Sequence, residues 1–194
     1  MATVQTKLLT AEEFFEWANR PENADRFLEL DEGEVVEMPP PGEIHGVLCG
    51  FIAHLLWAYV LERGKGAVSS NDTGLLVKRK PGTVRGPDIM VFDESRPLRR
   101  LSRKYSERVP RLIVEVLSPN DKMPKVNRRI SQYLKRGVPL VWLVDAETRT
   151  VTVYRHGKDF EVLRGHEVVT GEDVLPKLRY RVAELFAVPG EEGE

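Results

Sequence analysis

The segment from Leu112 to Leu117 is a near-continuous run of apolar residues, and it constrains the fold more than any other part of the chain. Such a run is typical of a central β-strand that is covered on both faces. It contains a single charged residue, Glu115. Because an ionised carboxylate inside a buried strand is costly unless it is paired or bound to a metal, Glu115 is either the partner of a core arginine or lysine, or part of a functional site.

Hydrophobic periodicity and turn residues divide the rest of the chain into short elements. Apolar residues at helical spacing predict a long helix that starts at about Ile44 and ends at Gly64. A basic segment after Ser118 predicts a second helix that ends at about Arg136. The remaining predicted elements are helices over 11–18 and 182–186, and strands over 27–30, 34–38, 75–77, 89–92, 140–144, 151–155 and 160–163.

This order of elements predicts an α/β fold in which a central mixed sheet is flanked by helices. With 194 residues, we expect a single domain with a core over about 10–187. Residues 94–108 are charged and contain a proline, which indicates a long mobile loop, and 188–194 are expected to form a flexible acidic tail.

Composition narrows the class of protein. An apolar fraction of 41% and a charged fraction of 30% favour one packed core over disorder. The single cysteine, Cys49, excludes an intramolecular disulfide and a cysteine-based zinc cluster, and its apolar context predicts a core position. No apolar run approaches the roughly 18 residues of a membrane helix, and the first ten residues lack a signal core. We therefore expect a cytoplasmic protein without a membrane partner.

The net charge of −1 hides a strong asymmetry along the chain. Residues 1–45 contain three basic and eleven acidic side chains, a net charge of −8. Residues 96–136 contain thirteen basic and three acidic side chains, a net charge of +10. Such a basic block suggests a polyanion partner. The alternative is a solvated surface that pairs with the acidic segment, and charge alone does not decide between them.

Asp88 offers a second carboxylate close to Glu115. It follows Pro87 and opens the predicted strand 89–92, although it could also be only a turn cap. Two neighbouring strands can each direct one carboxylate to the same point, where the two repel unless they share a proton or a cation lies between them. Mg²⁺ is the natural cation, with Mn²⁺ as the alternative, because hard cations bind carboxylates, waters and phosphate oxygens.

Several other residues are weaker candidates, each with an ordinary structural alternative. Glu29 lies between two leucines and is a third candidate metal ligand, or part of an exposed hairpin face. Lys125 and Arg129 share one face of the basic helix and could contact phosphate, with Asp121 one turn earlier, or could form a solvated face. His45, at the start of the long helix, could orient a water or a carboxylate, or could simply be a cap.

The ordered set of motifs resembles the PD-(D/E)XK nuclease superfamily, and more closely the Uma2 family of restriction-endonuclease-like proteins, formerly a domain of unknown function. The resemblance runs from Thr10 to Phe186. The motifs that carry it are Phe27 to Pro41, His45, Pro87-Asp88-Ile89, Val114 to Pro119, and Tyr133 to Asp145.

The resemblance implies a restriction-endonuclease-like fold and Mg²⁺-dependent hydrolysis of DNA phosphodiester bonds. It implies that Asp88 and Glu115 are metal ligands, with Glu29 as an additional acidic residue. In the Uma2-like pattern a lysine lies four residues before the position of Tyr133, where this chain has Arg129. Arginine keeps the charge but cannot deprotonate, which argues against a neutral lysine base at this position, and Lys125, one turn earlier, is the candidate substitute.

Three hypotheses therefore follow from the sequence. The first is a metal-dependent endonuclease in which Asp88 and Glu115 hold the metal, Arg129 or Lys125 neutralises charge, and the basic block grips DNA, including Lys122 and Arg128. The second is a catalytically inactive nucleic-acid-binding module on the same fold. The third is an interaction protein with no DNA role. Nucleases of this superfamily often dimerise, which leaves a homodimer open.

Overall fold

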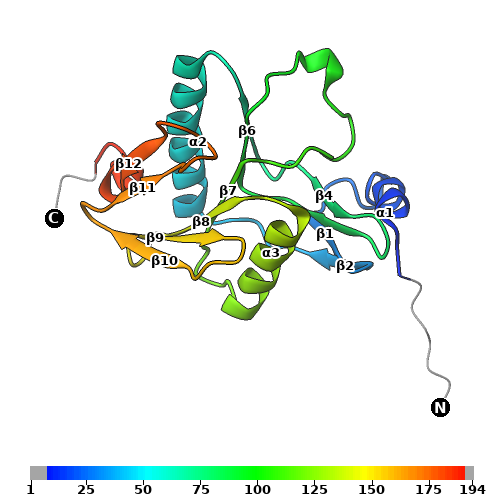
Figure 1. Cartoon of the computed structure of the whole chain (residues 1–194). Coiled ribbons are helices and arrows are strands. Elements are labelled where there is room, and N and C mark those ends of the chain that lie inside the picture. The colour runs from blue at the N-terminus through cyan, green and yellow to red at the C-terminus, as the bar shows by residue number, and fades with distance from the viewer. Residues whose placement is uncertain (1–7, 191–194) are drawn as a thin grey trace.

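A six-stranded mixed sheet forms the centre of the protein, whose computed structural model describes residues 8–190 (Figure 1). Its strand order is β10-β9-β8-β7-β6-β3. The strands span Glu161–Arg164 (β10), Thr150–Arg155 (β9), Leu140–Asp145 (β8), Leu112–Val116 (β7), Ile89–Phe92 (β6) and Ala67–Ser70 (β3). Strand β7 pairs parallel with β8, and the other neighbours pair antiparallel. The apolar run around Glu115 is therefore an internal strand, as predicted, and all five residues of β7 are buried.

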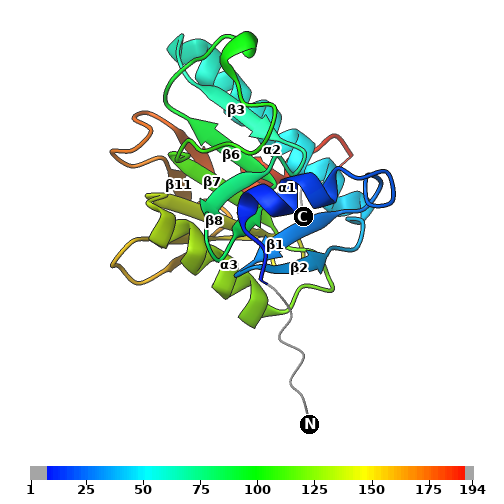
Figure 2. The same cartoon turned by 90° about the vertical axis from the view of Figure 1, so that its right-hand side faces the viewer.

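Two helices cover the opposite faces of this sheet (Figures 1 and 2). Helix α2 (Glu43–Arg63) ends at Gly64, whose φ of 70° gives the left-handed cap that the sequence predicts. Helix α3 (Met123–Arg136) ends at Gly137 in the same conformation, with a φ of 101°. Because side chains alternate along a strand, β7 sends Val114 and Val116 into the core under α2, and Ile113 into the core under α3.

A smaller sheet of four strands, in the order β2-β1-β5-β4, lies beside the central sheet. Its strands are Leu28–Asp31 (β1), Glu34–Glu37 (β2), Leu75–Lys78 (β4) and Thr83–Arg85 (β5). Helix α1 (Ala11–Ala18) packs Phe14 against this sheet and opens with the predicted capping box, in which Thr10 and Glu13 exchange hydrogen bonds. Strand β5 leads directly to Asp88, so this sheet positions one side of the candidate site.

The C-terminal part closes the core under α2. A hairpin of Val168–Thr170 (β11) and Arg179–Arg181 (β12) is followed by the 3₁₀ helix η2 (Val182–Phe186). Leu185 and Phe186 join the core formed by α2 and the central sheet, which agrees with the predicted short docking helix. The tail expected over 188–194 lies mainly outside the described residues.

Most predicted elements are present, with four additional short strands. Strands β3, β5, β11 and β12 were not expected from the sequence, because each has only three or four residues of mixed polarity. The segment 94–108 projects from the body as a long connection (Figure 1), but it contains a short 3₁₀ helix, η1 (Leu98–Arg100). Ser106 also forms a parallel bridge with Leu75, which ties the end of this segment to the smaller sheet.

Helix α2 has a high mean hydropathy, although polar residues interrupt its apolar runs. Its 21 residues contain an 18-residue window of mean hydropathy 1.8, so by length and composition it is long enough to cross a membrane. The core helix of a globular domain has the same properties. One face of α2, including Leu48, Ile52 and Leu56, is buried against the central sheet.

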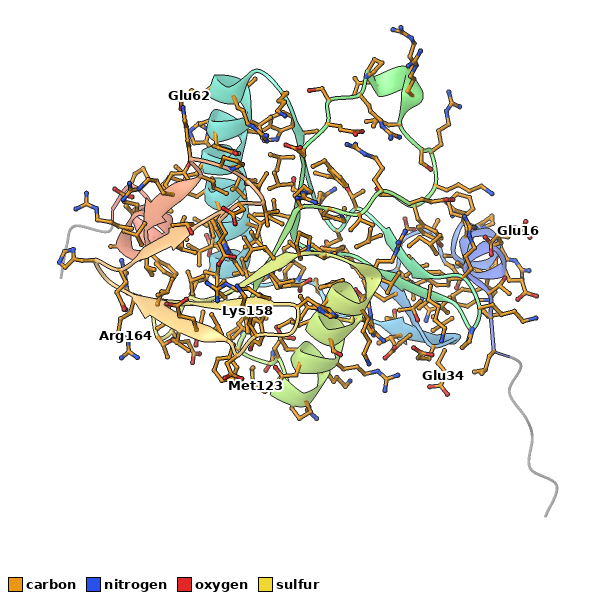
Figure 3. All side chains as sticks on the ribbon, in the orientation of Figure 1. Glu16, Glu34, Glu62, Met123, Lys158 and Arg164 are labelled. Carbon is orange, nitrogen blue, oxygen red and sulfur yellow. The ribbon has the colours of Figure 1, made fainter. Side chains whose placement is uncertain are left out.

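Charged side chains point outward around the periphery, as seen for Glu16, Glu34, Glu62 and Arg164 (Figure 3). The acidic and basic segments of the chain meet in the ion pair between Asp31 and Arg128, whose Oδ2 and Nε atoms are 3.0 Å apart. At this point the basic segment 96–136 pairs with the acidic segment 1–45, which was the alternative to a polyanion partner.

Candidate active site

The pairing of β6 and β7 brings Asp88 and Glu115 to the same place. Ile89 is opposite Val114 in this antiparallel pair, so Asp88, one residue earlier, reaches the level of Glu115. The backbone N–H of Val116 donates a hydrogen bond of 2.7 Å to Asp88 Oδ2. This bond fixes the Asp88 carboxylate just before the start of β6, with 10% of its side chain exposed.

Glu115 points toward α3, where two side chains bind its two oxygens. Arg129 Nη1 lies 2.7 Å from Glu115 Oε2, and the Tyr133 hydroxyl donates a hydrogen bond of 2.7 Å to Oε1. Burial raises the pKa of Glu115 to about 7; the charge of Arg129 opposes this rise, and the charge of Asp88 adds to it. Glu115 is therefore paired with a buried arginine and also lies close to a second carboxylate, Asp88.

The first turns of α2 bring two further side chains, His45 and Cys49, close to Asp88. His45 Nε2 lies 3.2 Å from Asp88 Oδ1, and Cys49 Sγ lies 3.5 Å from His45 Nδ1. The hydrogen bond to Asp88 raises the pKa of His45, although burial opposes this rise. Burial also raises the pKa of the Cys49 thiol, which keeps it protonated as long as no cation is bound. His45 therefore belongs to the carboxylate cluster.

Glu29 is oriented by a different partner. Its Oε2 lies 2.8 Å from Arg85 Nη1, and its Oε1 accepts a hydrogen bond of 2.9 Å from the backbone N–H of Gly86. Arg85 also contacts Asp31, with 2.8 Å between Nη2 and Oδ1. Both Glu29 and Arg85 are buried, and the Gly86 that binds Glu29 lies two residues along the chain from Asp88.

The other sequence-predicted residues lie at the surface of α3 and before it. Lys122, Lys125 and Arg128 are exposed. Asp121 accepts a hydrogen bond of 2.9 Å from the Ser118 backbone N–H and so stabilises the turn between β7 and α3. The structure thus brings Asp88, Glu115, Arg129 and His45 together, while the lysines remain on the outer surface.

Sequence reasoning did not assign a role to three residues that shape this site. Tyr133 follows Arg129 by four residues and Cys49 follows His45 by four residues, so helical spacing was an available signal for both. Asp72 carried no such signal. Burial and the charge of Asp88 raise the pKa of Asp72, which places this carboxyl within electrostatic reach of the cluster.

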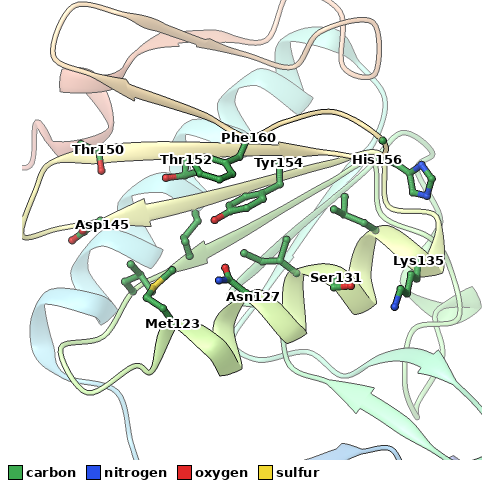
Figure 4. A pocket seen from close by; sticks show the side chains of 15 residues that line it. Met123, Asn127, Ser131, Lys135, Asp145, Thr150, Thr152, Tyr154, His156 and Phe160 are labelled. Carbon is green, nitrogen blue, oxygen red and sulfur yellow. The ribbon is translucent and has the colours of Figure 1, made fainter.

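Another groove in the described part of the chain lies away from this cluster. It has a volume of about 640 Å³ and runs between α3 and strands β8 and β9 (Figure 4). Met123, Asn127 and Ser131 line it from the helix, and Thr152 and Tyr154 line it from β9. None of the clustered carboxylates contributes to this groove, so it is separate from the candidate site.

The donor groups at Asp88 and Glu115 fit a divalent cation. Burial is the main cause that raises the pKa of Glu115, and the charge of Asp88 adds to it, as expected where two carboxylates lie close together. Each carboxylate oxygen has two lone pairs, so the hydrogen bonds from Val116, Arg129 and Tyr133 leave acceptor capacity for a metal. Together with His45, the site combines metal-ligand chemistry with an adjacent permanent cation, Arg129.

Comparisons with known proteins show the fold and the family of this chain. A solved structure described as "a putative nuclease belonging to DUF820" from Anabaena variabilis matches with a TM-score of 0.78 and 23% sequence identity, over 92% of this chain and 97% of that chain. This likeness shows the same fold. The comparison with curated proteins gives no match. The family model described as "Uma2: Putative restriction endonuclease" matches residues 11–183, so the chain belongs to the Uma2 family.

Proposed function

We propose that the protein is a Mg²⁺-dependent endonuclease that hydrolyses DNA phosphodiester bonds. The observation that carries this proposal is the meeting of Asp88 and Glu115 across β6 and β7, with Arg129 bound to Glu115. Membership of a family named for restriction endonucleases and the nuclease-named structural neighbour support it. Mn²⁺ would serve the same carboxylate ligands.

Asp88 and Glu115 would bind the metal, and their hydrogen-bond partners would fix the orientation of the two carboxylates. A divalent cation at this position lowers the pKa of a bound water and neutralises charge on a phosphate. The Val116 N–H orients Asp88, and Tyr133 orients Glu115. Glu29, bound to Arg85 and the Gly86 N–H, contributes negative charge near Asp88 rather than a free carboxylate.

Arg129 would act on the phosphate as a fixed positive charge. Its guanidinium remains protonated, and Glu115 raises its pKa further. It therefore has no role as a base, but it can stabilise negative charge that develops in the transition state. The exposed Lys122, Lys125 and Arg128 would contact the DNA backbone, which positions the duplex without reading its sequence.

Nicking of supercoiled plasmid by the purified protein tests this function. We expect nicking in Mg²⁺ that stops in excess chelator, and we expect Asp88→Asn and Glu115→Gln to abolish it while the variants stay folded by circular dichroism. The matched control is Asp145→Asn, because Asp145 caps the turn after β8 and lies outside the cluster. Normal cleavage by both site variants would refute the metal site.

The second candidate function is a nucleic-acid-binding module without catalysis. The observation in its favour is that Arg129 occupies the family's lysine position and is paired with Glu115 at 2.7 Å. In that case the plasmid stays intact, while salt-sensitive DNA binding is retained. An absence of binding to any nucleic acid at low salt would reject both functions.

A further inference from the structure

We propose that His45, Cys49 and Asp88 form a mixed nitrogen, sulfur and oxygen site that binds Zn²⁺ in preference to Mg²⁺. The proposal goes beyond the proposed function, with which it shares Asp88, because it assigns a cation of another class to the His45 side of the cluster. Within residues 8–190, these three residues are the one group of three whose ligand atoms all lie within 4.8 Å of one another.

The local geometry of α2 places two of the ligands. His45 and Cys49 are four residues apart in the first turns of the helix and therefore share a face. That face meets the start of β6, where the Val116 N–H holds Asp88 Oδ2 at 2.7 Å and leaves Oδ1 directed at His45. A ligand carboxylate that is itself hydrogen-bonded is typical of metal sites, because the bond fixes its orientation.

The spacing of His45 Nε2 and Asp88 Oδ1 fits a small tetrahedral cation, and Cys49 Sγ lies close to both. Zn–N bonds of about 2.0 Å and Zn–S bonds of about 2.3 Å place neighbouring ligand atoms roughly 3.3–3.6 Å apart. His45 Nε2 lies 3.2 Å from Asp88 Oδ1 and 3.9 Å from Cys49 Sγ. Cys49 Sγ also lies 3.5 Å from His45 Nδ1, so the Cys49 side chain has to rotate toward Nε2 for its sulfur to bind the same cation.

The chemistry of the donors determines which cation is preferred. Mg²⁺ binds oxygen and keeps several of its waters, whereas imidazole and thiolate ligands favour Zn²⁺ and related transition metals. When the cation binds, the Cys49 S–H bond breaks, a sulfur–metal bond forms and the proton passes to solvent. Three protein ligands leave one tetrahedral position open, as in catalytic rather than structural zinc sites.

Titration of the metal-stripped, full-length protein with Co²⁺ tests this site directly. Cys49 is the only cysteine in the chain, so a near-ultraviolet thiolate-to-cobalt charge-transfer band reports this residue alone. We expect the band in the wild-type protein and its loss in Cys49→Ser. We expect His45→Ala to weaken Co²⁺ binding about ten-fold or more. The control His54→Ala, an exposed histidine on the same helix, should leave the band unchanged.

Competition and a second variant separate this proposal from the nuclease function. Zn²⁺ should remove the cobalt band at stoichiometric amounts, whereas a roughly hundred-fold excess of Mg²⁺ should not. Glu115→Gln should keep the band, because Glu115 is not one of the three ligands. Absence of the band in wild-type protein, or its removal by Mg²⁺, would overturn the zinc site whatever the plasmid assay shows. A normal band without plasmid cleavage would retain the site and reject the nuclease.

Discussion

Arg129 Nη1 lies 2.7 Å from Glu115 Oε2, and this ion pair joins α3 to the central strand of the sheet. Only 14% of the Arg129 side chain and 4% of the Glu115 side chain are exposed. The pair thus does two things at once: it compensates the charge of a buried carboxylate, and it fixes a permanent positive charge next to Glu115. The consequences for stability and for catalysis can be separated by substitution.

Replacement of Arg129 tests both roles. We expect Arg129→Met to lower the free energy of unfolding by about 3 kcal/mol, because it leaves Glu115 buried without its cation. Arg129→Lys keeps the charge, so it should lose less stability and should retain or raise plasmid cleavage. Urea denaturation and the nicking assay measure the two effects. Equal stability of the Met and Lys variants would contradict this account of the pair.

Arg85 should contribute more to stability than an exposed arginine with the same number of carboxylate partners. It contacts both Glu29 and Asp31 at 2.8 Å and is buried, so Arg85→Met should cost about 3–5 kcal/mol. Arg79, which pairs with Glu12 and Glu107 at the surface, is the matched control, and Arg79→Met should cost at most about 1 kcal/mol. Adding Glu29→Gln to Arg85→Met should recover part of the loss, as measured by urea denaturation.

Asp31 should make the free energy of unfolding depend on pH in the acid range. Burial opposes its ionisation, but the Gln132 hydrogen bond and the charges of Arg85 and Arg128 outweigh burial and lower its pKa. A carboxylate whose pKa is lowered by folding stabilises the folded state above its unfolded pKa, and this contribution is lost as the pH falls through the folded pKa. The stability difference between wild type and Asp31→Asn should therefore be full at neutral pH and shrink below about pH 4.

Thermal melts of wild type and Asp31→Asn across the acid range measure this difference. Asp145→Asn serves as the comparison, because Asp145 contacts a surface turn instead of arginines. A difference that stays constant from neutral pH to below about pH 4 would exclude the proposed linkage.

Lys125 should contribute to DNA affinity without reading sequence. It is exposed on α3, one turn before Arg129. Removal of one lysine that neutralises a phosphate should reduce the slope of log affinity against log salt by about 0.9. Lys125→Ala should therefore weaken binding to unrelated duplexes equally, as measured by fluorescence anisotropy at several salt concentrations. Lys177→Ala, an exposed lysine between β11 and β12, should change neither affinity nor slope.

Local patterns in the sequence were enough to predict the main elements. The apolar run at Leu112 predicted a central strand, helical spacing predicted α2, and Gly64 and Gly137 predicted the helix ends, because these features depend on residues close together in the chain. Short strands such as β3 and β12 were missed because three or four residues of mixed polarity produce no detectable period.

The sequence by itself determined that a carboxylate, Glu115, would be buried in the central strand and that Asp88 would begin a neighbouring one. Only the tertiary structure decided what surrounds them. A strand buried on both faces has no alternation of polarity, so nothing local shows that Glu115 faces α3 while Val114 and Val116 face α2. The register between β6 and β7 and the packing of α2 and α3 then select the partners. These long-range contacts pair Glu115 with Arg129, and they bring His45 and Cys49 to Asp88.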